Sequence, residues 1–127
     1  MPSVHQACKL TGQERKASNR RRTKIAELTD GVVPALQSHQ FSRGVKLVEQ
    51  RLKLLAEEGI TSPMLMCNAE YDAFQACKYA QKHKDARKWL VLADSHARMA
   101  EGDDSLAVKK MTRLLAQPLT APLSNSR

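Results

Sequence analysis

The chain has 127 residues, of which 42% are hydrophobic, 27% charged and only 4% aromatic, and its net charge at neutral pH is +8. This length suits one domain with one modest core, which Leu, Ala, Val and Met must build because aromatic residues are scarce. No apolar run approaches the roughly 18 residues of a membrane span, and the N-terminus lacks the basic and apolar regions of a secretory signal. We therefore expect an intracellular protein, in the nucleus or the cytoplasm, that does not bind membranes.

The three cysteines, Cys8, Cys67 and Cys77, are odd in number and include no CxxC pair. This usage argues against a disulfide-bonded scaffold and favours a reducing location. Cys67 and Cys77 stand ten residues apart on one expected helix, and we expect both to be small core residues, since free cysteine is often buried.

The N-terminal part of the chain shows little apolar periodicity, and we expect residues 1–17 to be mobile. Ser18 is a suitable N-cap for a helix that runs to about Thr29. Gly31 and Pro34 are then expected to interrupt it, with a short helix before the next break.

Residues 43–58 carry the clearest amphipathic pattern, with Val45, Val48, Leu52 and Leu55 at spacings of three, four and three. Gly59 is well placed to end this helix in a left-handed conformation. Ser62 and Pro63 then predict the N-cap and first residue of another helix, to about residue 80.

Two rows of small residues follow, one in each of two successive expected helices. The first row is Ala69, Ala73, Ala76 and Ala80, and the second is Ala86, Leu90, Ala93, Ala97 and Ala100. A short link, residues 81–85, makes the two helices antiparallel, and we expect the rows to be in contact, because small side chains let helix axes approach. Gly102 ends the second helix, Asp103, Asp104 and Ser105 offer a cap for a last one, and Pro118 stops it.

These elements predict an all-α fold of about five helices arranged as antiparallel hairpins, in the manner of tetratricopeptide-type (TPR-like) helix pairs. The expected helical domain covers residues 18–118. Residues 119–127 are expected to form a disordered tail.

Two segments carry a resemblance to a known family. The first, residues 8–25, reads CKLTGQERKASNRRRTKI, and the second, residues 96–118, reads HARMAEGDDSLAVKKMTRLLAQP. The first resembles the end of the cysteine-rich post-SET segment of fungal SET-domain proteins, where a last zinc cysteine precedes a polar stretch ending in S-(D/N)-x-R-R. The matching residues are Cys8, Glu14, Arg15, Ser18, Asn19, Arg21 and Arg22. The second is similar to the helices that close those proteins.

The resemblance implies a relation to lysine methyltransferases, whose S-adenosylmethionine site and catalytic tyrosine lie in the SET core. That core would precede residue 1, so we expect no methyltransferase activity, no enzyme function and no cofactor for this chain. Cys8 is at most a vestigial zinc ligand, since Cys8 and His5 alone cannot supply the four ligands of a structural zinc site. We expect a stand-alone or fragmentary member of the family.

The positive charge is concentrated at one end, because residues 1–24 hold seven of the 21 Lys and Arg residues and one of the 13 acidic ones. The cluster Arg20, Arg21, Arg22 and Lys24 could bind nucleic acid, act as a nuclear localisation signal, or meet an acidic protein surface. A solvated helix start is the simpler interpretation, because no aromatic residue is interleaved for base stacking.

No catalytic arrangement is evident elsewhere in the sequence. His39, His83 and His96 are far apart, and Asp94, Ser95 and His96 cannot form a relay because adjacent residues on a helix point about 100° apart. The leading hypothesis is a non-catalytic helical module that binds a protein partner. The alternative is a basic protein that binds nucleic acid non-specifically through residues 15–24.

Overall fold

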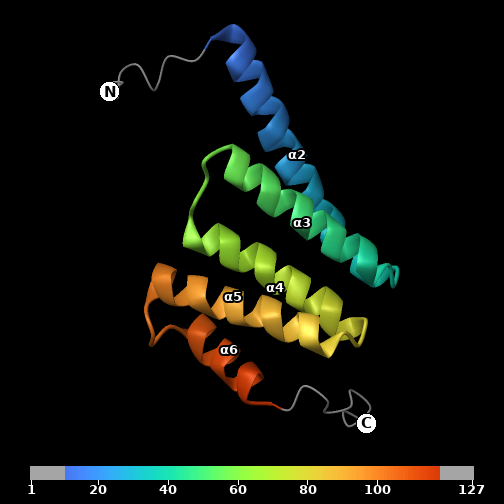
Figure 1. The fold of residues 1–127 in the computed structure, drawn as a ribbon, viewed down its shortest axis with the longest axis vertical. Coiled ribbons are helices and arrows are strands. Elements are labelled where there is room, and N and C mark those ends of the chain that lie inside the picture. Colours follow the sequence, from blue (N-terminus) through green and yellow to red (C-terminus); the bar gives the residue numbers. More distant parts are fainter. Residues whose placement is uncertain (1–10, 118–127) are drawn as a thin grey trace.

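The structure, a computed structural model, describes residues 11–117 and is all-helical over that range (Figure 1). The elements are α2 (Gly12–Gln37), α3 (Phe41–Glu57), α4 (Pro63–Tyr79), α5 (His83–Glu101) and α6 (Leu106–Ala116). The prediction of an all-α fold with about five helices is confirmed. Cys8, His5 and the predicted tail 119–127 lie outside the described residues.

The helices follow one another across the molecule, each antiparallel to the one before it, and the N-terminal part of α2 extends past the end of α3 (Figure 1). The short connections enforce this arrangement, because a chain that leaves one helix and starts the next within a few residues must reverse direction. Among residues 11–117, none of the helices is both long and apolar enough to cross a membrane.

Helix α2 differs most from the sequence prediction. It begins at Gly12, where Thr11 and Glu14 form a capping box: the Thr11 hydroxyl accepts from the Glu14 amide, and the Glu14 carboxylate accepts from the Thr11 amide. The hydrogen bond from Thr11 lowers the pKa of Glu14. Residues 12–17 therefore belong to a helix and not to a mobile segment, and Ser18 is not the N-cap.

The expected interruption at Gly31 and Pro34 is also wrong, since α2 continues through both residues to Gln37. Packing explains this result: Val32 and Ala35 are buried, and an added Cβ at Gly31 would come within 3.3 Å of Leu47 Cδ1 on α3. Glycine thus allows a close approach of the two helices. Pro34 is exposed, so water can hydrate the carbonyl that loses its amide partner.

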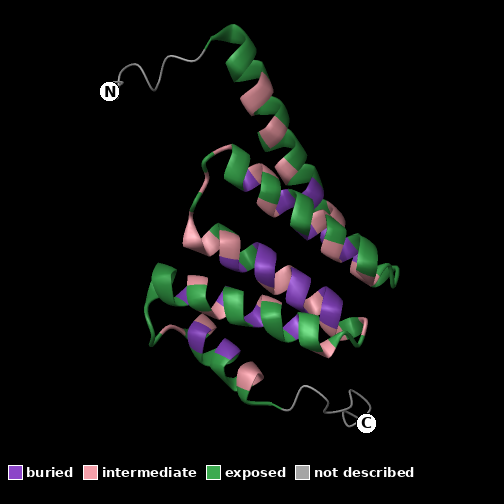
Figure 2. Ribbon diagram, viewed as in Figure 1, coloured by how far each residue is buried: buried purple, intermediate pink, exposed green. Residues whose placement is uncertain are grey.

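Helix α4 lies at the centre of the molecule and carries the most buried residues (Figure 2). Its alanines Ala69 and Ala73 lie in a different core cluster from the alanines of α5. Ala69 and Ala73 pack in one cluster with Val32 of α2 and Val48 of α3, and Ala76 faces Gly44 of α3.

The alanine row of α5 packs instead in a second cluster with the larger side chains of α4 and with α6. This cluster comprises Cys67, Phe74, Cys77, Ala86, Leu90, Ala93, Ala97, Val108 and Met111. The buried members of the two rows thus fall in different clusters, because adjacent α4 residues such as Ala73 and Phe74 point to different neighbours. The expected burial of Cys67 and Cys77 is confirmed.

The remaining helix ends agree closely with the sequence signals. Ser62 and Ser105 accept hydrogen bonds from the amides of Leu65 and Val108, as N-caps do. Gly59 and Gly102 follow α3 and α5 with φ of 70° and 87°, a region that glycine enters without a Cβ penalty.

Candidate functional site

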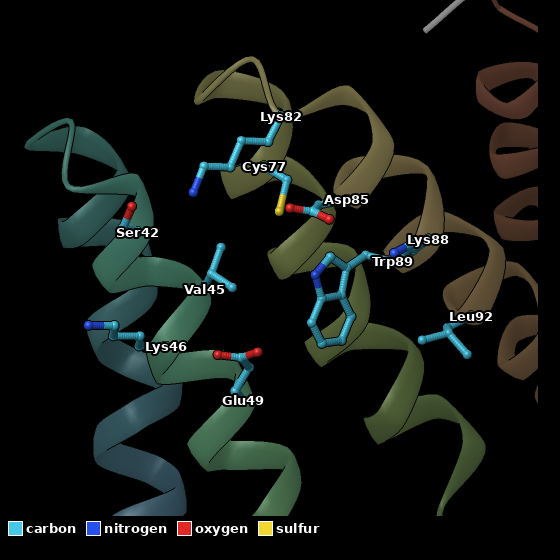
Figure 3. A pocket seen from close by; sticks show the side chains of 10 residues that line it. All are labelled: Ser42, Val45, Lys46, Glu49, Cys77, Lys82, Asp85, Lys88, Trp89 and Leu92. Carbon is cyan, nitrogen blue, oxygen red and sulfur yellow. The ribbon is translucent and has the colours of Figure 1, made fainter.

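A groove with a volume of about 630 Å³ lies between α3 and α5 (Figure 3). Helix α3 lines it with Ser42, Val45, Lys46 and Glu49, α5 with Asp85, Lys88, Trp89 and Leu92, and Cys77 and Lys82 close it at the end of α4. Both α3 and α5 pack on α4. The groove lies between α3 and α5, over the surface of α4.

Trp89, the single tryptophan of the sequence, forms the apolar wall of this groove. It is half-buried and packs against both core clusters, while Val45 packs against the second. Figure 3 shows the indole facing the open space between the two helices. The Trp89 indole is thus held by core contacts on one side, and its other side is open to solvent.

The apolar surface continues from the groove onto the outer face of α5. Leu92 is 45% exposed and Val91 49% exposed. A second, shallower hollow of about 590 Å³ is lined by Lys84, Arg87, Lys88, Val91 and Leu92. The two hollows share Lys88 and Leu92, so they form one surface, which we name the α3/α5 groove.

Cations outnumber carboxylates around the α3/α5 groove. The cations are Lys46, Lys82, Lys84, Arg87 and Lys88, and the carboxylates are Glu49 and Asp85. Asp85 lies in the first turn of α5, where the helix dipole favours a negative charge. The net positive charge of this surface favours an acidic ligand.

The Cys77 thiol in this groove lies in an environment that raises its pKa. Burial raises its pKa, and the nearby Asp85 carboxylate raises it further. Burial likewise raises the pKa of Cys67. Reactive cysteines need the opposite environment, one that lowers the thiol pKa.

The basic cluster predicted from the sequence is divided by the fold. Three donors from α2 meet the carboxylate of Glu58: Ser18 Oγ at 2.7 Å, Arg21 Nε at 2.5 Å and Arg22 Nε at 3.2 Å. The Glu58 side chain is only 4% exposed. The hydrogen bond from Ser18, followed by those from the two arginines, lowers the Glu58 pKa. We name this arrangement the Glu58 clamp.

Arg20 and Lys24, by contrast, are exposed and have no ion-pair partner among residues 11–117. The structure therefore does not present Arg20, Arg21, Arg22 and Lys24 as one free basic patch. Sequence reasoning missed this, because Glu58 lies more than thirty residues further along the chain.

Polar contacts also join the other helices. Arg51 of α3, 5% exposed, donates from Nη1 to Asp72 Oδ2 of α4 at 2.9 Å. His96 Nδ1 of α5 lies 2.7 Å from Glu70 Oε1 of α4. Burial raises the Glu70 pKa, and the His96 hydrogen bond offsets part of that effect. Each pair joins α4 to a neighbouring helix, and pairs of this kind add little net stability.

In the sequence His96 is far from the other histidines, and the fold places it beside Glu70 of α4. Within residues 11–117 no three His, Cys, Asp or Glu side chains are placed to hold a metal ion.

Comparison of the chain with protein-family models, with curated protein sequences and with solved structures finds no match in any of the three. The geometry of the described residues is therefore the basis for assigning a function.

Proposed function

We propose that this chain is a non-catalytic helical module that binds an acidic, amphipathic segment of a partner protein in the α3/α5 groove. The observation that carries the proposal is the continuous apolar surface of Val45, Trp89, Leu92 and Val91 bordered by five cations. Apolar side chains of a partner would bury this surface, and its carboxylates would face the lysines.

The structure of the surface supports a peptide segment over a small molecule. The groove is open and extends along α5, so that successive side chains of a helix can occupy it as anchors at spacings of three and four residues. Trp89 is held by the two core clusters, so little conformational entropy is lost when a ligand covers it. Electrostatic complementarity would add mainly to the association rate and the specificity.

The proposal includes the relation to the C-terminal helical region of fungal SET-domain proteins and the TPR-like character of the helix pairs. Support comes from several of the residues that carry the resemblance, which have roles in the fold. Ser18, Arg21 and Arg22 form the Glu58 clamp, and Gly102, Ser105, Val108 and Met111 end α5, cap α6 and fill its buried face. The free, buried thiols of Cys67 and Cys77 support an intracellular location.

Non-specific nucleic-acid binding through residues 15–24 remains the alternative, supported by the exposure of Arg20 and Lys24. The Glu58 clamp counts against it, because Arg21 and Arg22 are already paired with a carboxylate. A phosphate would have to displace Glu58 to use them.

Fluorescence anisotropy with a labelled peptide tests the proposal. The probe is an amphipathic peptide with one face of Leu and the other of Glu, and its control replaces every Glu with Lys. We expect saturable binding of the Glu peptide that weakens with salt, and no binding of the Lys peptide.

Leu92→Glu places a charge in the groove, whereas Met99→Glu makes the same change on the same helix at a side chain that is 70% exposed and outside the groove. Covering the exposed half of Leu92 is worth about 1 kcal/mol, so Leu92→Glu should weaken binding about tenfold or more and Met99→Glu should not. Equal effects of the two changes would contradict the proposal, and so would binding of a DNA duplex in place of the Glu peptide.

A further inference from the structure

The Glu58 clamp joins the N-terminal half of α2 to the end of α3. No residue of α2 before Leu28 is buried, and the only half-buried side chains there are Ala17, Ser18, Arg21 and Ile25. This half-helix also extends away from the other helices (Figure 1). Because an isolated helix of this length is marginal in water, the contacts with Glu58 decide whether it stays packed on α3.

Ser18 stands in a sequence that a protein kinase with an acidic substrate groove can recognise. Arg15 lies three residues before it and Lys16 two residues before it, and kinases select substrates by charge patterns of this kind. Ser18 is also the group that most lowers the Glu58 pKa. The modifiable hydroxyl is thus itself part of the contact that holds α2.

We propose that Ser18 is a phosphorylation site and that its phosphorylation opens the Glu58 clamp. In the transfer, the Ser18 Oγ bonds to the γ-phosphorus of ATP while the bond from that phosphorus to the bridging oxygen breaks. ADP leaves, and the hydroxyl proton passes to the catalytic base of the kinase. The product carries about −1.5 to −2 charges and has no hydroxyl donor.

The consequence follows from the geometry of the clamp. Ser18 Oγ lies 2.7 Å from Glu58 Oε2, so the phosphate would meet a carboxylate that is almost fully buried. Glu58 would lose its hydroxyl donor, and the phosphate would compete for Arg21 and Arg22, which follow Ser18 by three and four residues on the same helix. The repulsion and the loss of donors both separate α2 from the end of α3.

Thr23 provides an internal control. It follows three arginines, so the same kinase can modify it, yet it is exposed and is not part of the clamp. A phosphate on Thr23 adds the same charge to α2 without touching Glu58. Comparing a phosphate on Ser18 with one on Thr23 therefore distinguishes opening of the Glu58 clamp from a general effect of added charge on α2.

The experiment incubates the full chain with ATP and a kinase that prefers basic substrates, and follows each site by mass spectrometry. We expect phosphate on Ser18, and a rate at Ser18 that rises at least severalfold in Glu58→Ala, where the hydroxyl is released, while the rate at Thr23 stays the same. Phosphate on Thr23 alone in both proteins would overturn the proposal.

Hydrogen–deuterium exchange then measures the opening itself. Phosphoserine at position 18 should raise amide exchange in residues 16–27 about tenfold and leave α4 and α5 unchanged, whereas phosphothreonine at position 23 should not. In Glu58→Ala the added phosphate should have no further effect, because the clamp is already open. Unchanged or slower exchange with phosphoserine would show that the phosphate strengthens α2 and would refute the switch.

Discussion

Replacement of the buried Gly44 of α3 by alanine should stabilise the protein. An alanine Cβ at this position would lie 3.4 Å from Leu36 Cδ2 and 3.6 Å from the Ala76 Cβ, which are ordinary van der Waals distances. Alanine in a helix interior is about 0.8–1.0 kcal/mol better than glycine. We therefore expect a gain of about 1 kcal/mol, equivalent to a rise in Tm of about 5 °C for a domain of this size.

Urea unfolding followed by circular dichroism measures this gain, and Gly59→Ala is the matched control. Gly59 has a φ of 70° and no atom within 4 Å of its added Cβ, so its substitution changes only backbone strain and should cost roughly 1–2 kcal/mol. Opposite signs for the two variants are expected. A loss of stability in Gly44→Ala as large as that in Gly59→Ala would refute the packing described for α3 against α4.

Two further predictions concern packing and pH. Ala76→Leu and Ala93→Leu should each lower the free energy of unfolding by about 1–3 kcal/mol through overpacking. In urea unfolding the double variant should show the sum of the two losses, because the two alanines pack in different interfaces. A loss in the double variant far from that sum would mean that the two alanine rows are in contact. For Glu58, the folded pKa is below the ordinary value of 4.5, so its stabilisation is complete above pH 4.5 and is lost as the pH falls below it. Glu70 has the opposite effect on stability, because its pKa is raised. Its contribution is present below pH 4.5 and is lost as the pH rises through the raised pKa. Unfolding measured from pH 4 to 7 should show this loss in wild type and not in Glu70→Gln.

The sequence predicted the helix ends that depend on local chemistry. Ser62, Gly59 and Gly102 act through hydrogen bonds or backbone conformations within a few residues, and each is found where it was expected. Of the three cap candidates Asp103, Asp104 and Ser105, the structure uses Ser105. The start of α2 had a local signal as well, the Thr11-x-x-Glu14 capping box, which the loosely patterned N-terminal sequence obscured.

Features that depend on distant residues could not be read from the sequence. Gly31 and Pro34 favour a break locally, but the packing of Val32 and Ala35 keeps α2 continuous. Periodicity identified the alanine rows without showing which helix each row faces. The Glu58 clamp and the Glu70–His96 pair join residues 26 to 40 positions apart, and the α3/α5 groove combines two helices that are separated by a third.

The emission of Trp89 tests the central claim most directly, because this side chain is the only tryptophan and lies in the wall of the groove. Titration with the Glu-faced amphipathic peptide, itself free of tryptophan, should shift the emission to shorter wavelength as the indole leaves water, with the same midpoint as the anisotropy. The Lys-faced peptide should cause no shift. Saturable binding with unchanged Trp89 emission would place the partner elsewhere and would contradict the account.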